Sequence, residues 1–428
     1  MIQQLSLNNV GPAPEMNLDF GERLNIITGD NGLGKSFLLD CIWWAMTRKW
    51  PAQINKKIGA GNMGLPSSAG KATISFVLDG KTKKSKTYQA DFDRRQQAWI
   101  GAQGRPINPG LILYAMADGS FAIWDPARNY WKNSSSENSS SRPAAYVFNP
   151  QEIWNGLPAD TEGNAWLCNG IIRDWASWQK ENGEAWEQIK QVLKCLSPAQ
   201  EPMEPGALTR INLDDVRDMP TIKMPYGTSV PLLHASSAMR RIIALAYCLV
   251  WAWQEHKKAA ELLGEAVTRS VTFLIDEIEA HLHPQWQRQI TAALVAVMNS
   301  LMNDASVQLI ITTHAPLVMA ACEDVFSQKT DRWFDIDMQD ARVVLSQLTY
   351  QPRGTAECWL NSPAFDLSST RAPQIAEIIN QASHLLCMPS PDPAEIQRID
   401  KFLVEKLSPE DKTLIRWRYI CHQRNLLS

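Results

Sequence analysis

The stretch Gly29-Asp30-Asn31-Gly32-Leu33-Gly34-Lys35-Ser36 is the part of this 428-residue sequence from which its fold can be predicted. It has the pattern G-x-x-x-x-G-K-S, it follows the apolar run 24–27, and residues 37–47 after it are typical of a helix. A strand, a glycine-rich loop and a helix in this order indicate a phosphate-binding P-loop. Glycines let the backbone amides curl around phosphate oxygens, and the helix N-terminus favours their negative charge.

The P-loop supplies the first candidate site residues. Lys35 is placed to reach the β- and γ-phosphates of a nucleotide, and the hydroxyl of Ser36 is placed to bind Mg²⁺. The residues expected to bind the nucleotide here are Gly29, Asn31, Gly32, Gly34, Lys35, Ser36 and Phe37. ATP and Mg²⁺ are therefore the expected ligands.

Two later apolar runs end in polar residues that suit the same chemistry. After run 271–275, Asp276 is placed to hold Mg²⁺, and Glu277 to polarise the water that attacks the γ-phosphate. After run 307–311, His314 can approach the γ-phosphate. The expected catalytic residues are Lys35, Glu277 and His314, and the expected metal ligands are Ser36 and Asp276.

The order of the segments predicts an α/β fold. Alternating segments at 2–7 and 16–20 indicate an N-terminal antiparallel β region. The apolar runs that flank the candidate site residues alternate with helices, which predicts a mixed or mostly parallel central sheet. The expected domains are 1–330, an ATPase domain with a helical insertion at about 51–230, and 331–428, a mainly helical C-terminal region that is a candidate for docking a partner.

Composition limits the class of protein. A net charge of −3 excludes a globally basic nucleic-acid-binding chain, so any such binding needs a local patch. One candidate is the group Lys81, Lys83, Lys84 and Lys86, but an edge strand guarded by lysines is the commoner explanation for such a group. Eight cysteines without a C-x-x-C pair indicate reduced thiols. With no leader pattern and no long apolar run, we expect a cytoplasmic protein without a membrane partner.

The series of motifs resembles the ABC-type ATPases of the RecF, SMC and OLD group. Residues 29–36 resemble Walker A, 273–277 resemble Walker B, and 281–284 fall at the D-loop. Thr313-His314 resembles the switch histidine, and 234–241 resemble the signature motif. This resemblance covers residues 1–50 and 230–320, and it implies an ABC-type P-loop fold that binds ATP with Mg²⁺.

In that group the signature motif binds the γ-phosphate of ATP held by the other subunit. The resemblance therefore adds Ser236 and Ser237 to the nucleotide-binding residues and implies a head-to-tail homodimer or a higher homo-oligomer. The group usually has Gly where this sequence has Ala238, and the added methyl is expected to slow hydrolysis or loosen the dimer. The Q-loop residue stays open among Gln89, Gln96, Gln97 and Gln151.

Within the group, the domain layout favours an ATPase without a catalytic domain of its own. The sequence has no coiled-coil run typical of an SMC tether, and Asp335-Ile336-Asp337 supplies only half of a Toprim nuclease pattern. The layout resembles the ATPase subunits of bacterial anti-phage systems, the Septu type first and the PARIS type as competitor. Their nuclease, of HNH or Toprim type, would be a separate chain.

Three functional hypotheses follow. The first is a slowly hydrolysing ATPase that dimerises around nucleotide and controls a nuclease. The second is a RecF-like DNA-binding repair ATPase, and the third is an ATP-bound scaffold with little turnover. The basic and aromatic segment 412–424 fits DNA or RNA binding, partner docking, or plain surface with Trp417 packed inward.

Overall fold

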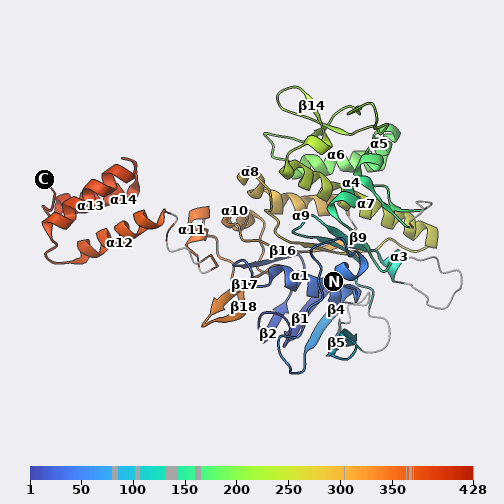
Figure 1. Cartoon of the computed structure of the whole chain (residues 1–428), viewed down its shortest axis with the longest axis horizontal. Helices are drawn as coiled ribbons and strands as arrows, with labels where there is room; N and C mark the ends of the chain where they lie inside the picture. The colour runs from blue at the N-terminus through green and yellow to red at the C-terminus, as the bar shows by residue number, and fades with distance from the viewer. Residues whose placement is uncertain are drawn as a thin grey trace. The chain divides into compact units, whose positions relative to one another are not determined.

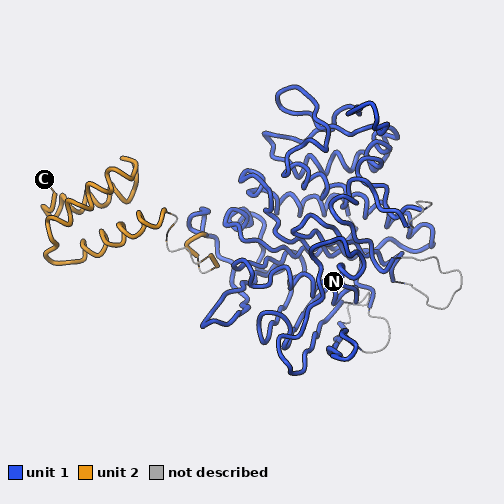
Figure 2. Tube along the Cα trace, viewed as in Figure 1, with its two compact units in different colours: residues 1–359 blue, residues 360–428 orange. Residues whose placement is uncertain are grey.

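The structure is a computed structural model, and it describes residues 1–79, 85–101, 107–130, 143–159, 165–302, 304–362, 364–365, 369 and 371–427. The chain forms two compact units, Met1–Trp359 (unit 1) and Leu360–Ser428 (unit 2) (Figure 2). This boundary lies after the expected one at 330/331. The reason is that β17 (Arg332–Gln339) and β18 (Arg342–Leu348) extend the central sheet of unit 1.

The centre of unit 1 is an eight-stranded mixed sheet with the order β18-β17-β3-β16-β15-β7-β8-β9 (Figure 1). Neighbouring strands from β17 to β7 run parallel, and the pairs at both edges are antiparallel. The remaining bounds are β3 (Leu24–Gly29), β16 (Ser306–Thr312), β15 (Ser270–Ile275), β7 (Leu111–Ala115), β8 (Phe121–Trp124) and β9 (Tyr146–Phe148). The prediction of an α/β fold with a mixed central sheet is confirmed.

The N-terminal antiparallel sheet has the order β2-β1-β4-β5-β6. Its strands are β1 (Ile2–Asn8), β2 (Glu15–Asp19), β4 (Thr73–Asp79), β5 (Ser85–Asp93) and β6 (Ala98–Gly101). Lys81, Lys83 and Lys84 lie outside the described residues. Lys86 lies 5.3 Å from the ring centroid of Tyr88, so its described contact is within the sheet.

Residues 51–230, the expected insertion, contain strands as well as helices. Strands β4 to β9 complete the two large sheets, because β4 pairs with β1 and β7 pairs with β15, and the other four strands extend from these two. The helices are α2 (Pro51–Ile54), α3 (Pro126–Asn129), α4 (Pro150–Asn155), α5 (Ile171–Glu181) and α6 (Glu184–Leu196). Short strands β10 (Leu157–Pro158), β11 (Trp166–Cys168), β12 (Glu204–Pro205), β13 (Thr221–Lys223) and β14 (Ser229–Pro231) complete the insertion.

The helices that position the site come from two parts of the sequence, one near residue 40 and the other after residue 236. Helix α1 (Lys35–Thr47) contacts strands of both large sheets and is buried along most of its length. The others are α7 (Ser237–Leu263), α8 (Pro284–Gln287), α9 (Ile290–Leu301) and α10 (Pro316–Ala321), with 3₁₀ turns at Leu232–His234 and Cys322–Asp324. Helices α8 and α9 are separated at Gln289, whose φ of −135° is not helical.

Unit 2 is a small helical module with its own core. Its helices are α12 (Pro373–Cys387), α13 (Pro393–Lys406) and α14 (Lys412–Gln423), and α11 (Ala356–Leu360) lies at the boundary. Trp417 is buried in this core, and its indole donates to Asp400 over 3.2 Å. Arg418 pairs with the same carboxylate, and Arg424 donates to backbone carbonyls at the end of α12. These contacts favour the inward packing of Trp417.

Candidate nucleotide-binding site

The P-loop joins the end of β3 to the start of α1. Gly29 has a φ of +137°, and an added Cβ would lie 2.3 Å from the carbonyl oxygen of Ile336 on the neighbouring strand. Gly34 has a φ of +104°, and a Cβ there would lie 2.8 Å from the ring of Pro12. Both positions require glycine because backbone conformation and space exclude a side chain. Asn31, Gly32 and Ser36 are exposed around this turn, so a ligand can reach them.

The ammonium group of Lys35 folds back over the loop. It donates to the carbonyl oxygens of Gly29 (2.7 Å) and Asp30 (2.9 Å), and the residue is buried. Burial lowers the pKa of Lys35, and the nearby carboxylates of Glu277, Glu279, Asp276 and Asp30 oppose this shift. The cation is therefore held at the loop by weak acceptors that phosphate oxygens can replace. The ring of Phe37 packs over Gly11, which leaves its backbone amide as the group that can bind phosphate.

Asp276 and Glu277 follow β15 and are fixed by one hydroxyl. Thr312, at the end of the adjacent β16, donates through Oγ1 to Oδ1 of Asp276 (2.7 Å) and accepts the backbone N–H of Glu277 (2.8 Å). Glu277 has a φ of +47°, an uncommon conformation for a residue with a side chain. The carboxylate of Asp276 and the backbone of Glu277 are thus held at the strand end, and Asp276 is buried while Glu277 is half-buried.

The second oxygen of Asp276 fits a metal ion. Oδ2 is buried, and it has no hydrogen-bond partner among the residues that the structure describes. An unpaired buried carboxylate oxygen is costly, and a divalent cation would satisfy it. Ser36 offers a hydroxyl at the start of α1, so these two residues would hold Mg²⁺. When bound, the metal would neutralise phosphate charge.

His314 lies beyond β16 and is oriented by Glu279, a residue that our sequence interpretation missed. Nδ1 of His314 lies 2.9 Å from Oε1 of Glu279, which also accepts the N–H of His314 and, through Oε2, the hydroxyl of Thr313. The hydrogen bond with Glu279 raises the pKa of His314, against the effect of burial. Burial would raise the pKa of Glu279, but bonds from His314 and Thr313 outweigh it and lower that pKa.

The two serines of the signature-like motif lie at the start of α7. Ser236 is the N-cap, and its Oγ accepts the backbone N–H of Met239 over 3.3 Å. Ser237 follows it, and both serines are exposed. Ala238 lies next in the first turn, half-buried. The free amides of this helix N-terminus can receive negative charge from outside.

Arg241 links this helix to the turn after β15 that carries Asp276 and Glu277, which we call the carboxylate turn. The sequence interpretation gave Arg241 no role of its own. Its guanidinium donates to the carbonyl oxygens of Ala117 (3.1 Å), Asp276 (3.1 Å) and Glu277 (3.3 Å). The start of α7 is therefore joined by a hydrogen bond to the backbone of Asp276, the expected metal ligand.

The remaining candidates are Asp335 and the four glutamines considered for the Q-loop. Asp335 is buried on β17 and accepts a hydrogen bond from the hydroxyl of Thr28. The same hydroxyl accepts a hydrogen bond from the indole N–H of Trp333 over 2.8 Å. The role of Asp335 within the sheet does not favour a nuclease site. The structure places Gln89, Gln96 and Gln97 in or beside the N-terminal sheet and Gln151 in the first turn of α4.

Comparison with known proteins decides the family. Residues 24–320 match the family described as "AAA domain, putative AbiEii toxin, Type IV TA system". The chain belongs to this family. The prediction of an ABC-type ATPase related to those of anti-phage systems is confirmed. No helix in the described part of the chain is long and apolar enough to cross a membrane.

The chain is also similar to individual curated proteins and to a solved structure. The Septu protein PtuA of Bacillus thuringiensis is 20% identical over 385 residues, which are 89% of this chain and 88% of the relative. The Septu protein PtuA of Bacillus mycoides strain KBAB4 is 32% identical over 143 residues, 32% of this chain and 18% of that one. The Retron Ec83 probable ATPase of Escherichia coli is 25% identical over 153 residues, 35% and 25% of the two chains. The SMC head domain from Thermotoga maritima aligns with a TM-score of 0.39 and 15% identity, covering 81% of this chain and 99% of that one.

Proposed function

We propose that this chain is a cytoplasmic, slowly hydrolysing ATPase that dimerises around ATP and controls a separate nuclease in anti-phage defence. One observation carries the ATPase part. Lys35, the adjacent pair Asp276 and Glu277, and His314 come from three separate segments, yet these segments follow β3, β15 and β16, which are neighbouring parallel strands that end at one edge of the sheet. The unpaired oxygen of Asp276 lies in the same cluster.

Each residue then has a chemical role. Lys35 and the loop amides bind the phosphates, and Ser36 and Asp276 would hold Mg²⁺. Glu277 orients the attacking water and takes its proton. His314, whose Nδ1 is held by Glu279, donates a hydrogen bond to the γ-phosphate.

Dimerisation completes the site in this proposal. Ser236 and Ser237 of one copy would bind the γ-phosphate held by Lys35 of the other, as their exposure at a helix N-terminus permits. Ala238 would slow the cycle by widening this contact. Control of a nuclease is supported by the similarity to the Septu protein PtuA over 89% of the chain. Unit 2 is our candidate for docking that partner.

The test separates binding from turnover. Glu277→Gln keeps the shape of the side chain but removes the base, so we expect ATP binding to persist while kcat falls by about 10²–10³-fold. Light scattering should show that the variant accumulates as a dimer with ATP. Glu265→Gln, an exposed change in the same unit, is the matched control and should behave as wild type.

The outcomes distinguish the competing hypotheses. Equal turnover in wild type and Glu277→Gln, with ATP bound in both, would support the scaffold with little turnover. Salt-sensitive DNA binding by the chain alone that requires ATP would support the RecF-like alternative. An unchanged mass with and without ATP would contradict the dimer.

A further inference from the structure

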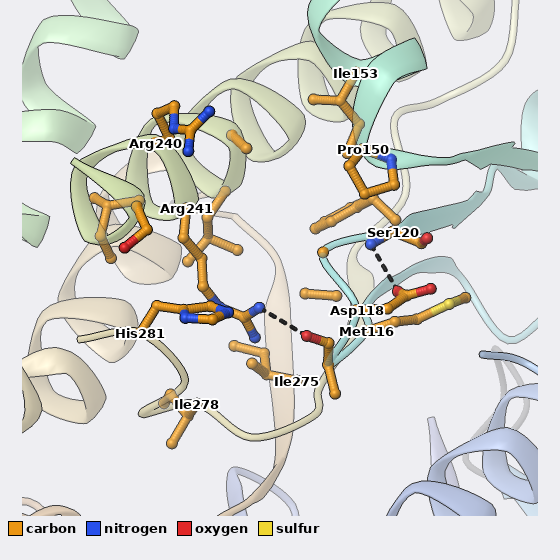
Figure 3. Close-up of a pocket in the computed structure, with 18 of the residues that line it drawn as sticks. Met116, Asp118, Ser120, Pro150, Ile153, Arg240, Arg241, Ile275, Ile278 and His281 are labelled. Atoms are coloured by element: carbon orange, nitrogen blue, oxygen red, sulfur yellow. Dashed lines mark hydrogen bonds between the residues drawn. The ribbon is translucent and has the colours of Figure 1, made fainter. Parts of the chain in front are cut away.

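A cavity of about 280 Å³ lies behind the carboxylate turn, between α7, α4, the turn from β7 to β8, and the segment after β15 (Figure 3). Its lining shares Ser237 with the candidate nucleotide site but includes none of Lys35, Ser36, Asp276 or His314. Its volume is close to the lower end for small-molecule pockets, which is about 300 Å³. It is therefore large enough for a ligand of its own.

The lining combines an apolar body with positive charge. Apolar side chains cover most of it, among them Met116, Phe121, Ile153, Trp154, Ile275 and Ile278. Arg240 and Arg241 supply the charge, and Figure 3 shows both residues on α7. Among the described residues, Arg240 has no side-chain hydrogen bond or ion pair, so its charge is available.

The acidic group in this cavity is already engaged. Asp118 accepts the backbone N–H of Ser120 through Oδ1 (2.9 Å) and that of Gly59 through Oδ2 (3.0 Å). A cationic ligand would compete with these bonds and meet two arginines. An anionic group would instead pair with Arg240 and leave them intact.

We propose that this cavity binds a small organic acid whose apolar body fills the pocket and whose carboxylate pairs with Arg240. Burial of the body supplies affinity, and the charged pair supplies specificity. Such a ligand would also contact the guanidinium of Arg241, which holds the carbonyls of Asp276 and Glu277. Occupancy would thus fix the carboxylate turn relative to the start of α7 and change ATP turnover. This regulatory part rests on the proposed ATPase function.

Direct binding tests the cavity without any need for turnover. The probe is 4-phenylbutyrate, measured by isothermal titration calorimetry on the full chain, with its uncharged amide as the matched ligand. We expect one saturable site and about tenfold weaker binding of the amide, as the loss of a charged hydrogen bond predicts. Arg240→Gln should remove the difference between acid and amide.

A filling variant locates the site. Ala244 lines the cavity on α7, so Ala244→Phe should weaken the acid at least tenfold. Leu262→Phe places the same ring at an exposed position of the same helix and should bind as wild type. Equal binding of acid and amide, or full binding to Ala244→Phe, would overturn the assignment. So would the absence of binding to the wild-type chain.

Turnover is measured separately. The acid should change the ATPase rate at least twofold in wild type and not in Ala244→Phe. Binding with an unchanged rate would overturn the regulatory part alone. A chain with no ATPase activity that still binds the acid would contradict the proposed function and leave the cavity assignment standing.

Discussion

The two halves of the candidate site differ in how completely one chain builds them. On the Lys35 side, buried or half-buried groups are fixed by named partners, such as Thr312 between Asp276 and Glu277. On the Ser237 side, the serine is exposed at the start of α7 and no described residue faces it with a hydrogen bond. One half is preorganised within the chain, and the other half offers donors outward.

This difference indicates at which step the polar groups of each half become ordered. The buried half pays for ordering its polar groups during folding, so it is ready before nucleotide arrives. The exposed half gains its contacts only when a second copy approaches, which makes assembly depend on the nucleotide. The predictions below test that division, from the largest expected effect to the smallest.

Mixing two inactive variants gives the largest effect. Lys35→Ala removes the phosphate cation, and Ser237→Glu opposes phosphate with like charge, so each alone should lose at least about 10²-fold in turnover. In the mixed dimer, the intact Lys35 of one copy meets the intact Ser237 of the other at one of two sites. An equal mixture should recover about a quarter of wild-type activity, since half the dimers are mixed and each has one good site.

Colorimetric phosphate release measures this recovery. A mixture of Lys35→Ala with wild type is the control. Its activity should not exceed the value calculated from the intact sites in its wild-type and mixed dimers. If the two variants gave no recovery although size measurement showed mixed dimers, the two halves would not meet across an interface.

Removing the hydroxyl of Thr312 tests the buried half. Thr312→Val leaves Oδ1 of Asp276 and the N–H of Glu277 without this partner, which should cost about 1–3 kcal/mol in unfolding free energy. We expect turnover to fall about tenfold as the carboxylate of Asp276 and the backbone of Glu277 lose this support. Thr272→Val is the matched control, because the buried hydroxyl of Thr272 has no partner among the described residues. Urea unfolding that ranked the two variants equally would contradict this view of Thr312.

The motifs of the buried half were predictable because the chain places them next to strong local patterns. Lys35 lies in the pattern G-x-x-x-x-G-K-S, which indicates a P-loop when it follows a strand and precedes a helix. Asp276 and His314 each follow an apolar strand. Glu279 and Arg241 were missed because their roles depend on contacts between segments: Glu279 with His314, and Arg241 with carbonyls of another element. The D-E-x-E spacing at 276–279 was the available signal for Glu279. The placement of residues 332–348 in the central sheet likewise depends on pairing with β3, which local pattern does not encode.

The two adjacent serines should differ, although both are exposed. Ser236→Ala removes the cap of α7 and should cost about 1 kcal/mol of unfolding free energy. Ser237→Ala removes no described hydrogen bond, so its effect on stability should stay within about 0.5 kcal/mol. Thermal unfolding without nucleotide measures both. An equal loss of stability would mean that Ser237 has a structural role within one chain.

The ion pair of His314 with Glu279 should give the smallest effect, and it should depend on pH. The pair raises the pKa of His314 above its ordinary 6.5, so its stabilisation is complete below about pH 6.5 and is lost as pH rises through the raised pKa. Glu279 keeps its charge throughout this window, because its pKa is lowered from 4.5. The His314 side chain is 41% exposed, so solvent screening limits the contribution to about 0.5 kcal/mol. Urea unfolding of wild type and His314→Gln should therefore differ at pH 6 and converge at pH 9, and high salt should reduce the difference at pH 6. A difference that grew with pH would mean that neutral His314, and not the ion pair, stabilises the end of β16.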